Sequence, residues 1–210
     1  MKQISPVYPI SQSGLDEKKL LRWAKTLLDC GAEFIQYREK NRSDKEIFKN
    51  AEKLLKLFES YKATLVINDR VDIAYILGIK AVHLGWDDIP PRRARELLGK
   101  RIILGISTHN YSVAKDAFSF PVNYLAVGPV FDTNTKKDHH PIVSPKTQER
   151  IIKECPFPAV AIGGISLGNA LELYKRGFSS LSAISVFEEN PAKAYKEFLR
   201  IYKESKNLTK

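Results

Sequence analysis

Cysteine is scarce in this chain of 210 residues, which contains only Cys30 and Cys155. Two cysteines provide neither a disulfide framework nor a Cys-x-x-Cys metal pattern. Long apolar runs are also lacking, because none approaches the roughly 20 residues that span a bilayer. Residues 1–19 contain no long apolar core of the kind that a secretory signal needs. We therefore expect a soluble protein of a reduced, cytoplasmic compartment, without a membrane partner.

Acidic residues are outnumbered, since 34 lysines and arginines against 24 aspartates and glutamates give a net charge of +10. Such an excess is typical of proteins that bind nucleic acid, a membrane surface or anionic small molecules. Most basic residues, however, alternate with acidic ones in helix-like stretches such as 15–29 and 44–60. The sequence also lacks an aromatic RNA-binding motif and zinc-finger spacing. We therefore expect no nucleic-acid partner, whereas anionic small molecules stay in consideration.

Short runs rich in valine, isoleucine, leucine and aromatic residues recur along the chain. There are eight, at residues 6–11, 33–38, 63–68, 81–85, 101–107, 123–131, 159–164 and 181–187. Several are almost continuously apolar, as expected for strands that are covered on both faces.

Helical patterns with recognisable ends separate these runs. Ser43 and Glu46 form a capping-box pattern, and Ser144 followed by Pro145 predicts another helix start. Further helices are expected within 15–29, 89–100, 166–177 and 190–205, the second of them ending at Gly99. Strands that alternate with helices predict parallel β-α units, in an open doubly wound sheet or a closed barrel. The count of eight favours a single (β/α)8 TIM-barrel domain over residues 1–210.

Polar residues stand at the end of the second apolar run and directly after it. Gln36, Arg38 and Lys40 alternate at a spacing of two, which in a strand directs all three side chains to one face. Because functional residues of such barrels gather where strands end, three long polar donors here suit an anionic or heteroaromatic ligand.

Acidic residues follow the next two runs. Asn68 and Asp69 end the third run, and Asp87 and Asp88 come shortly after the fourth. Each pair alone could simply cap the helix that follows it. Carboxylates at adjacent barrel strand ends can instead share a hard divalent cation such as Mg²⁺. His83, within the fourth run, is expected to be a core residue.

The segment 130–141 reads "VFDTNTKKDHHP" and allows three interpretations: a metal site, a basic loop for nucleic acid or a phosphate-binding loop. Adjacent histidines rarely share one ion, and the sequence has no second cluster of histidine or cysteine. Thr133, Thr135 and Lys136 are common phosphate partners, and Asn134 favours a turn. A phosphate-binding loop is therefore the best interpretation.

The remaining strand ends offer further ligands for phosphate. Ser107 supplies a hydroxyl for phosphate or a base, unless it caps the next helix. Gly164, Ile184 and Ser185 follow the last two runs, where barrels of this kind often bind phosphate through backbone N–H groups. Two anionic substrates that meet over one cation indicate a transferase that expels pyrophosphate.

Seven motifs in order now carry a family resemblance: "QYREK", "INDRVDIA", "VHLGWDD", "LGISTHN", "VGPVFDTNTKKD", "AIGGIS" and "AISVF". With them the sequence resembles the thiamine phosphate synthase family over nearly its whole length. The resemblance implies a Mg²⁺-assisted enzyme that joins 4-amino-5-hydroxymethyl-2-methylpyrimidine pyrophosphate to hydroxyethyl-methylthiazole phosphate. Thiamine phosphate and pyrophosphate would be the products.

The resemblance also implies roles for individual residues. The pyrimidine pyrophosphate would be bound by Gln36, Tyr37, Arg38, Glu39, Lys40, Asn68, Ser107 and Lys136. Among these, Arg38, Lys40, Ser107 and Lys136 would be catalytic. Asp69 and Asp88 match the magnesium ligands. The thiazole phosphate would be bound by Thr133, Asn134, Thr135, Gly164, Ile184 and Ser185. A homo-oligomer is compatible with the sequence.

Two departures from the family pattern concern Trp86, where glutamine is common, and the glycine-free segment "HHPIVSP" after "TKKD".

Two alternative functions differ from the synthase in what they predict. A thiazole tautomerase of the same pathway would resemble this sequence but have a histidine where Pro129 stands, and often lacks the acidic pair. A non-catalytic binder of phosphate ligands would bind without magnesium-dependent turnover.

Overall fold

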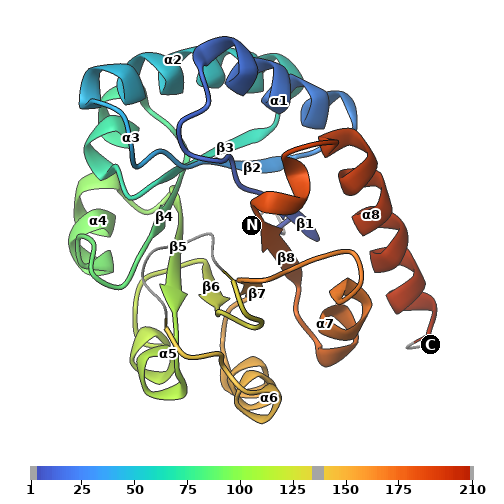
Figure 1. Ribbon diagram of the computed structural model, residues 1–210. Helices are drawn as coiled ribbons and strands as arrows, with labels where there is room; N and C mark the ends of the chain where they lie inside the picture. Colours follow the sequence, from blue (N-terminus) through green and yellow to red (C-terminus); the bar gives the residue numbers. More distant parts are fainter. Residues whose placement is uncertain (1–3, 134–139, 209–210) are drawn as a thin grey trace.

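A computed structural model describes residues 4–133 and 140–208 of the chain (Figure 1). Within these residues, eight parallel strands form one sheet in the order β1-β8-β7-β6-β5-β4-β3-β2. The strands are β1 (Val7–Pro9), β2 (Phe34–Tyr37), β3 (Thr64–Asn68), β4 (Ala81–Leu84), β5 (Ile103–Thr108), β6 (Tyr124–Val127), β7 (Ala159–Ile162) and β8 (Ser180–Ala183). A bridge between Ile10 and Gln36 joins β1 to β2, and the amide of Ser11 donates to the carbonyl of Gln36 at 2.9 Å. This contact closes the barrel, so the barrel prediction is confirmed and the open sheet is excluded.

The helices lie outside the ring of strands (Figure 1). They are α1 (Glu17–Asp29), α2 (Asp44–Tyr61), α3 (Val71–Leu77), α4 (Pro91–Leu98), α5 (Tyr111–Ala117), α6 (Pro145–Glu154), α7 (Ala170–Arg176) and α8 (Pro191–Asn207), with a 3₁₀ turn η1 (Ser185–Phe187) after β8. The capping box of Ser43 and Glu46, the N-cap at Ser144 and the C-cap at Gly99 are confirmed. None of the helices in the described part of the chain is long and apolar enough to cross a membrane.

Two expected elements are shorter than predicted. The run 181–187 leaves the sheet after Ala183, because its last paired neighbour on β1 is Pro9. The segment 166–177 becomes helical only at Ala170. Asn169 is responsible for this delay, since its side chain accepts from the Ser166 amide and donates to the Gly164 carbonyl, both at 2.9 Å. A side-chain turn therefore replaces the first helical turn.

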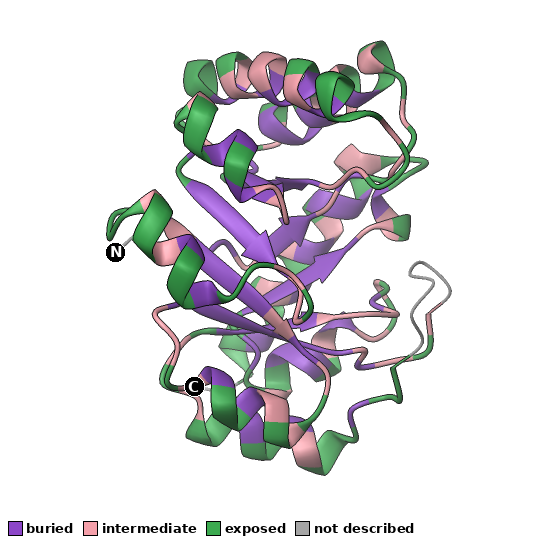
Figure 2. Ribbon diagram, turned by 90° about the vertical axis from the view of Figure 1, so that its left-hand side faces the viewer, coloured by how far each residue is buried: buried purple, intermediate pink, exposed green. Residues whose placement is uncertain are grey.

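Alternation along the strands divides the core into two clusters. The barrel interior contains Ile4, Tyr8, Phe34, Val66, Ala81, Tyr124, Ala126 and Val160. The larger cluster lies between the outer face of the sheet and the helices, where Figure 2 shows buried strands under helices with exposed outer sides. Gln36 and Asn68 lie two residues after interior positions, so their side chains project toward the interior at the carboxyl ends of their strands.

Candidate active site

Asp69 and Asp88 meet at the carboxyl ends of β3 and β4. The two carboxyl groups lie close enough for each to shift the pKa of the other. Asp69 has a left-handed backbone with φ of 60°, and its amide donates to the His83 carbonyl at 2.8 Å. Asp88 accepts from the Gly85 amide at 2.6 Å. Neither aspartate caps the following helix, so the capping interpretation is wrong for both.

The charges of this acidic pair are strongly coupled. Burial raises the pKa of Asp69 to about 6, the hydrogen bond with Asp88 adds to the rise, and Lys40 opposes it. Burial acts in the same direction on Asp88, but hydrogen bonds from Asp69 and the Gly85 amide outweigh it, so its pKa is lowered. The pair therefore shares one proton in mildly acidic solution. A cation placed between the two carboxylates would displace that proton.

The donor set of this acidic pair fits Mg²⁺. Both ligands are carboxylates, and the side chain of Asp69 is only 17% exposed. In the described residues, no group of three or more histidine, cysteine, aspartate or glutamate side chains forms a closed metal site. Magnesium is commonly bound by one or two carboxylates and completed by substrate phosphates and water. The two aspartates suit a metal that arrives with a phosphorylated substrate.

Arg38 and Lys40 reach this region from a loop rather than from a strand. Strand β2 ends at Tyr37, so the prediction that Gln36, Arg38 and Lys40 share one strand face is wrong, and only Gln36 lies on the strand. The Lys40 ammonium forms an ion pair with Asp69. The amide of Arg38 donates to the Ser11 hydroxyl at 2.9 Å. Loop geometry, which the spacing could not reveal, brings the two cations to the rim.

Tyr37 and Glu39 contact the protein itself. Tyr37 is buried on the outer face of β2, where its hydroxyl accepts from Asn50 of α2 at 3.4 Å. Glu39 accepts from the amides of Gly14 and Asn41 at 2.9 and 2.8 Å, and therefore joins the loops after β1 and β2. Both side chains support the loop that holds Arg38 and Lys40. Their contact with substrate stays a prediction.

Ser107 lies on β5 beside His83. The Ser107 hydroxyl and the Nε2 atom of His83 are 2.8 Å apart. His83 is 7% exposed, which confirms the prediction of a core position. Ser107 does not cap the next helix, because Asn110 is the N-cap of α5. The sequence did not lead us to predict this contact. The signal that could have revealed it is that both residues lie on neighbouring strands and face the barrel interior.

The loops after β6 and β7 pack closely together. Gly164 has φ of 66°, and a Cβ atom there would lie 2.5 Å from the carbonyl oxygen of Asp132. The amide of Thr133 donates to the Asp132 side chain at 3.0 Å. Glycine at 164 therefore lets Asp132 approach the turn after β7, which is a packing reason beside the predicted one of ligand access. Asn134, Thr135 and Lys136 lie outside the described residues, and their roles stay predictions.

Residues at both departures from the family pattern, Trp86 and the segment after "TKKD", contact other parts of the protein. The Trp86 ring stacks on Phe120 with centroids 6.1 Å apart. In the segment after "TKKD", the His140 ring stacks on His109 with centroids 4.0 Å apart, and His140 is exposed. The amide of Val143 donates to the Pro129 carbonyl at 2.9 Å. His140 and Val143 therefore contact residues that follow β5 and β6.

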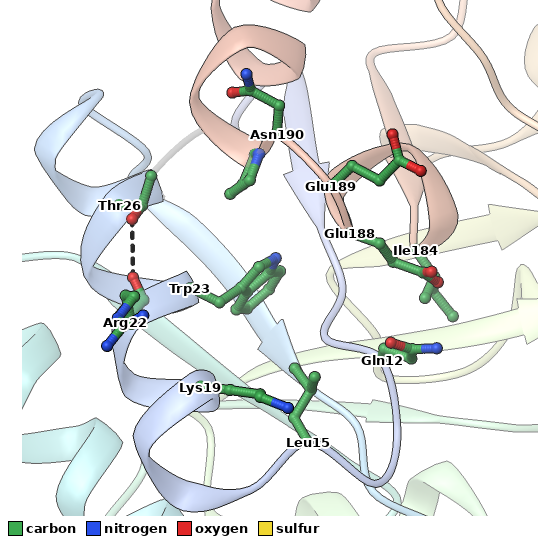
Figure 3. Close-up of a pocket in the computed structure, with 11 residues that line it drawn as sticks. Gln12, Leu15, Lys19, Arg22, Trp23, Thr26, Ile184, Glu188, Glu189 and Asn190 are labelled. Carbon is green, nitrogen blue, oxygen red and sulfur yellow. Dashed lines mark hydrogen bonds between the residues drawn. The ribbon is translucent and has the colours of Figure 1, made fainter.

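A pocket of about 480 Å³ lies between α1 and the segment from Ile184 to Pro191 (Figure 3). Trp23 projects into it and donates from Nε1 to the Phe187 carbonyl at 2.9 Å. Ile184 lines the pocket, so the pocket borders the rim at which the thiazole phosphate is predicted to bind. Its wall from α1 carries basic residues, whereas the opposite wall carries Glu188 and Glu189. Sequence reasoning did not predict this pocket.

Comparison with known proteins identifies the family of this chain. Residues 7–187 match the family model described as thiamine monophosphate synthase. The thiamine-phosphate synthase of Lawsonia intracellularis is 37% identical over 180 residues, 85% of this chain and 83% of that protein. That of Methanobrevibacter smithii is 36% identical over 199 residues, which are 94% and 95% of the two chains. The solved thiamine phosphate pyrophosphorylase of Pyrococcus furiosus superimposes with a TM-score of 0.83 at 29% identity, covering 95% and 96% of the chains. The chain therefore belongs to the thiamine monophosphate synthase family.

Proposed function

We propose that this chain performs the family's reaction with the residues gathered at the carboxyl ends of β2 to β8. It joins 4-amino-5-hydroxymethyl-2-methylpyrimidine pyrophosphate to hydroxyethyl-methylthiazole phosphate and releases pyrophosphate. The observation that carries the proposal is the pairing of Asp69 with Asp88 beside Lys40. Two coupled carboxylates next to a lysine suit a substrate that brings a pyrophosphate and a divalent cation.

Asp69 and Asp88 would hold Mg²⁺ in this proposal. Bound Mg²⁺ would neutralise the charge that grows on the departing pyrophosphate. Lys40 is the present ionic partner of Asp69. Lys40, Arg38 and Lys136 would supply the positive charges that bind the pyrophosphate. Preorganised cations of this kind stabilise a leaving anion.

The substitution needs no proton transfer. The bond between the pyrimidine methylene carbon and the pyrophosphate oxygen breaks, and its electron pair leaves with the oxygen. The aminopyrimidine ring delocalises the positive charge left on the methylene carbon. The thiazole nitrogen then forms the new bond with its own lone pair. The protein's part is therefore positioning and charge stabilisation, for which Gln36, Asn68 and Ser107 hold the first substrate.

The thiazole phosphate belongs to the other half of the rim. We assign it to Thr133, Asn134, Thr135, Gly164, Ile184 and Ser185. Support comes from the close approach of Gly164 to the loop after β6, and from the position of Ile184 and Ser185 at the end of β8. Backbone N–H groups and hydroxyls suit a phosphate that must be held without reacting.

The test is incubation of the purified protein with both substrates and Mg²⁺, with thiamine phosphate followed by chromatography. We expect magnesium-dependent product that Asp69→Asn abolishes. Binding of both ligands without product would contradict the proposal and favour a non-catalytic binder. Isomerisation of a thiazole substrate in place of condensation would favour the tautomerase.

We also propose that the protein works in the cytoplasm. The absence of a disulfide between Cys30 and Cys155, which are both free thiols, supports a reducing compartment. Fractionation of cells that express a tagged chain tests this proposal. A homo-oligomer stays a prediction, which sedimentation velocity of the purified chain would decide.

A further inference from the structure

A chain of buried hydrogen bonds crosses the barrel interior below the rim. Gln36 Nε2 donates to the Tyr8 hydroxyl at 2.6 Å, and the hydroxyls of Tyr8 and Tyr124 are 3.0 Å apart. Tyr124 contacts His83 Nδ1 at 2.9 Å, and His83 Nε2 contacts Ser107 at 2.8 Å. We call these five residues the buried chain. It connects two residues assigned to the pyrimidine substrate, Gln36 and Ser107, through three residues that have no assigned role.

The buried chain has a direction, because each hydroxyl has one hydrogen to donate. The amide nitrogen of Gln36 can only donate, so Tyr8 accepts from it and gives its own hydrogen to Tyr124. Tyr124 then donates to His83 Nδ1, which makes Nε2 the protonated nitrogen of a neutral imidazole. His83 Nε2–H donates to Ser107, and the hydroxyl hydrogen of Ser107 is left for a ligand. Burial raises the pKa of both tyrosines, which therefore keep their hydrogens.

If the hydrogen bonds ran in the opposite direction, the groups offered to a ligand at Gln36 and at Ser107 would both change. Ser107 would donate to His83, His83 to Tyr124, and Tyr124 to Tyr8. Tyr8 would then need an acceptor, so the Gln36 amide would have to turn over. In the direction set by Gln36 Nε2, the amide oxygen is the atom that the buried chain does not use, so Gln36 would offer an acceptor to a ligand, while Ser107 would offer a donor. The reverse direction would offer a donor at Gln36 and an acceptor at Ser107.

The packing of the barrel interior fixes the rings of the buried chain. A Cβ atom at Gly105 would lie 2.0 Å from Cζ of Tyr124, so only glycine on β5 leaves room for this ring. The Tyr124 ring stacks on His83 with centroids 5.5 Å apart and meets the edge of Tyr8 at 6.0 Å. Phenylalanine at both tyrosine positions would fill the same space without buried polar groups. Because buried polar groups cost stability unless they are fully paired, packing alone does not account for this network.

From this geometry we infer that Tyr8, Tyr124 and His83 are positioning residues that determine specificity for the pyrimidine substrate. The inference rests on the proposed function. The buried chain holds a hydrogen-bond acceptor at Gln36 and a donor at Ser107. An amino group on the pyrimidine supplies the hydrogen that Gln36 accepts, and a pyrophosphate oxygen accepts from Ser107. An analogue with an oxo group in place of the amino group would present an acceptor to an acceptor and would be rejected.

The test measures how strongly the protein distinguishes the two pyrimidines. Calorimetry with Mg²⁺ gives the dissociation constants of the aminopyrimidine pyrophosphate and of its oxo analogue, and turnover gives kcat and KM for both. We expect Tyr8→Phe to reduce the preference for the amino compound on the order of 10- to 100-fold, because Gln36 can then turn over. Tyr124→Phe should act in the same direction. Tyr174→Phe is the matched control, since its hydroxyl donates at 2.8 Å to the Pro6 carbonyl, away from the buried chain.

A second readout does not depend on turnover. Nitrogen-15 NMR of the wild-type histidines should show His83 as the neutral tautomer protonated at Nε2. Protonation at Nδ1 instead, or full selectivity in both Tyr8→Phe and Tyr124→Phe, would overturn the inference and leave the synthase proposal intact. Selective binding of the aminopyrimidine without product would contradict the proposed reaction. It would still support the specificity inference, because that inference needs the pyrimidine site and not turnover.

Discussion

The Lys40 ammonium forms an ion pair with Asp69, which lies 29 positions further along the chain, directly after the next strand of the barrel. Lys40 thus stabilises the ionised form of a carboxyl group whose pKa burial raises. We assign Lys40 to the pyrophosphate and Asp69 to the metal, yet in this structure the two side chains pair with one another. The contact gives the site a cation and an anion that can separate when a charged substrate enters.

We predict that Lys40→Ala raises the pKa of Asp69 above its value of about 6, because the opposing charge is removed. Carbon-13 NMR of the aspartate carboxyl groups as a function of pH measures this change. Lys53→Ala is the matched control, since Lys53 pairs with Glu17 instead. An Asp69 pKa that does not move in Lys40→Ala would show that the ion pair does not persist in solution.

We predict that Asp69→Asn makes the metal-free protein more stable near pH 7 while it abolishes turnover. The folded-state pKa of Asp69, about 6, lies above its ordinary value of 3.8, so folding favours the protonated form. The wild type therefore loses stability as pH rises from about 4 to 6, and asparagine avoids this loss. The gain is at most about 3 kcal/mol, since the shared proton with Asp88 offsets part of it.

Urea unfolding of both proteins near pH 4 and near pH 7 checks this result. The difference between wild type and Asp69→Asn should be small at the lower pH, where Asp69 is protonated. A difference that is the same at both pH values would contradict the assignment of the stability change to ionisation.

The sequence predicted the helix starts at Ser43 and Ser144 and the proximity of Asp69 and Asp88, because the physical causes of these features act locally. Ser43 and Ser144 cap helices through their own neighbours, and parallel barrel strands bring their carboxyl ends to one rim. It did not predict the contact between Tyr8 and Tyr124, which are 116 positions apart. The structure shows both side chains inside the barrel, and which interior side chains meet depends on the register and closure of the barrel.

The loop after β2 failed to follow its sequence pattern for a related reason. A spacing of two predicts a shared face only while the strand continues, and β2 stops at Tyr37. Beyond that point the backbone is directed by Ser11 and Glu39, which bind amides of their own and neighbouring loops. Contacts between loops that are distant in sequence are invisible to periodicity.

We predict that Gly164→Ala lowers the free energy of unfolding by about 2 to 4 kcal/mol and raises KM for the thiazole phosphate. An alanine methyl would sit 2.5 Å from the Asp132 carbonyl oxygen, in a residue whose φ of 66° already disfavours a side chain. The loop after β6 would have to move away from β7. Gly168→Ala is the matched control, because its nearest new neighbour, the Ser166 hydroxyl, is 3.8 Å away.

Urea unfolding and steady-state kinetics with each substrate varied separately test the role of Gly164. KM for the pyrimidine pyrophosphate should change less than KM for the thiazole phosphate. Equal effects of Gly164→Ala and Gly168→Ala would contradict the idea that the β7 turn supports the loop after β6.

We predict opposite pKa changes at His109 from two of its neighbours. Burial lowers the pKa of His109, the stacked His140 ring lowers it further, and the charge of Asp87 opposes both. His140→Ala should therefore raise the pKa of His109, and Asp87→Asn should lower it. Proton NMR of the imidazole signals during a pH titration measures both shifts. Because folding favours neutral His109, its contribution to stability is complete above about pH 6.5 and declines as pH falls below that value. Shifts of the same sign in the two variants would show that the ring of His140 does not contact His109 in solution.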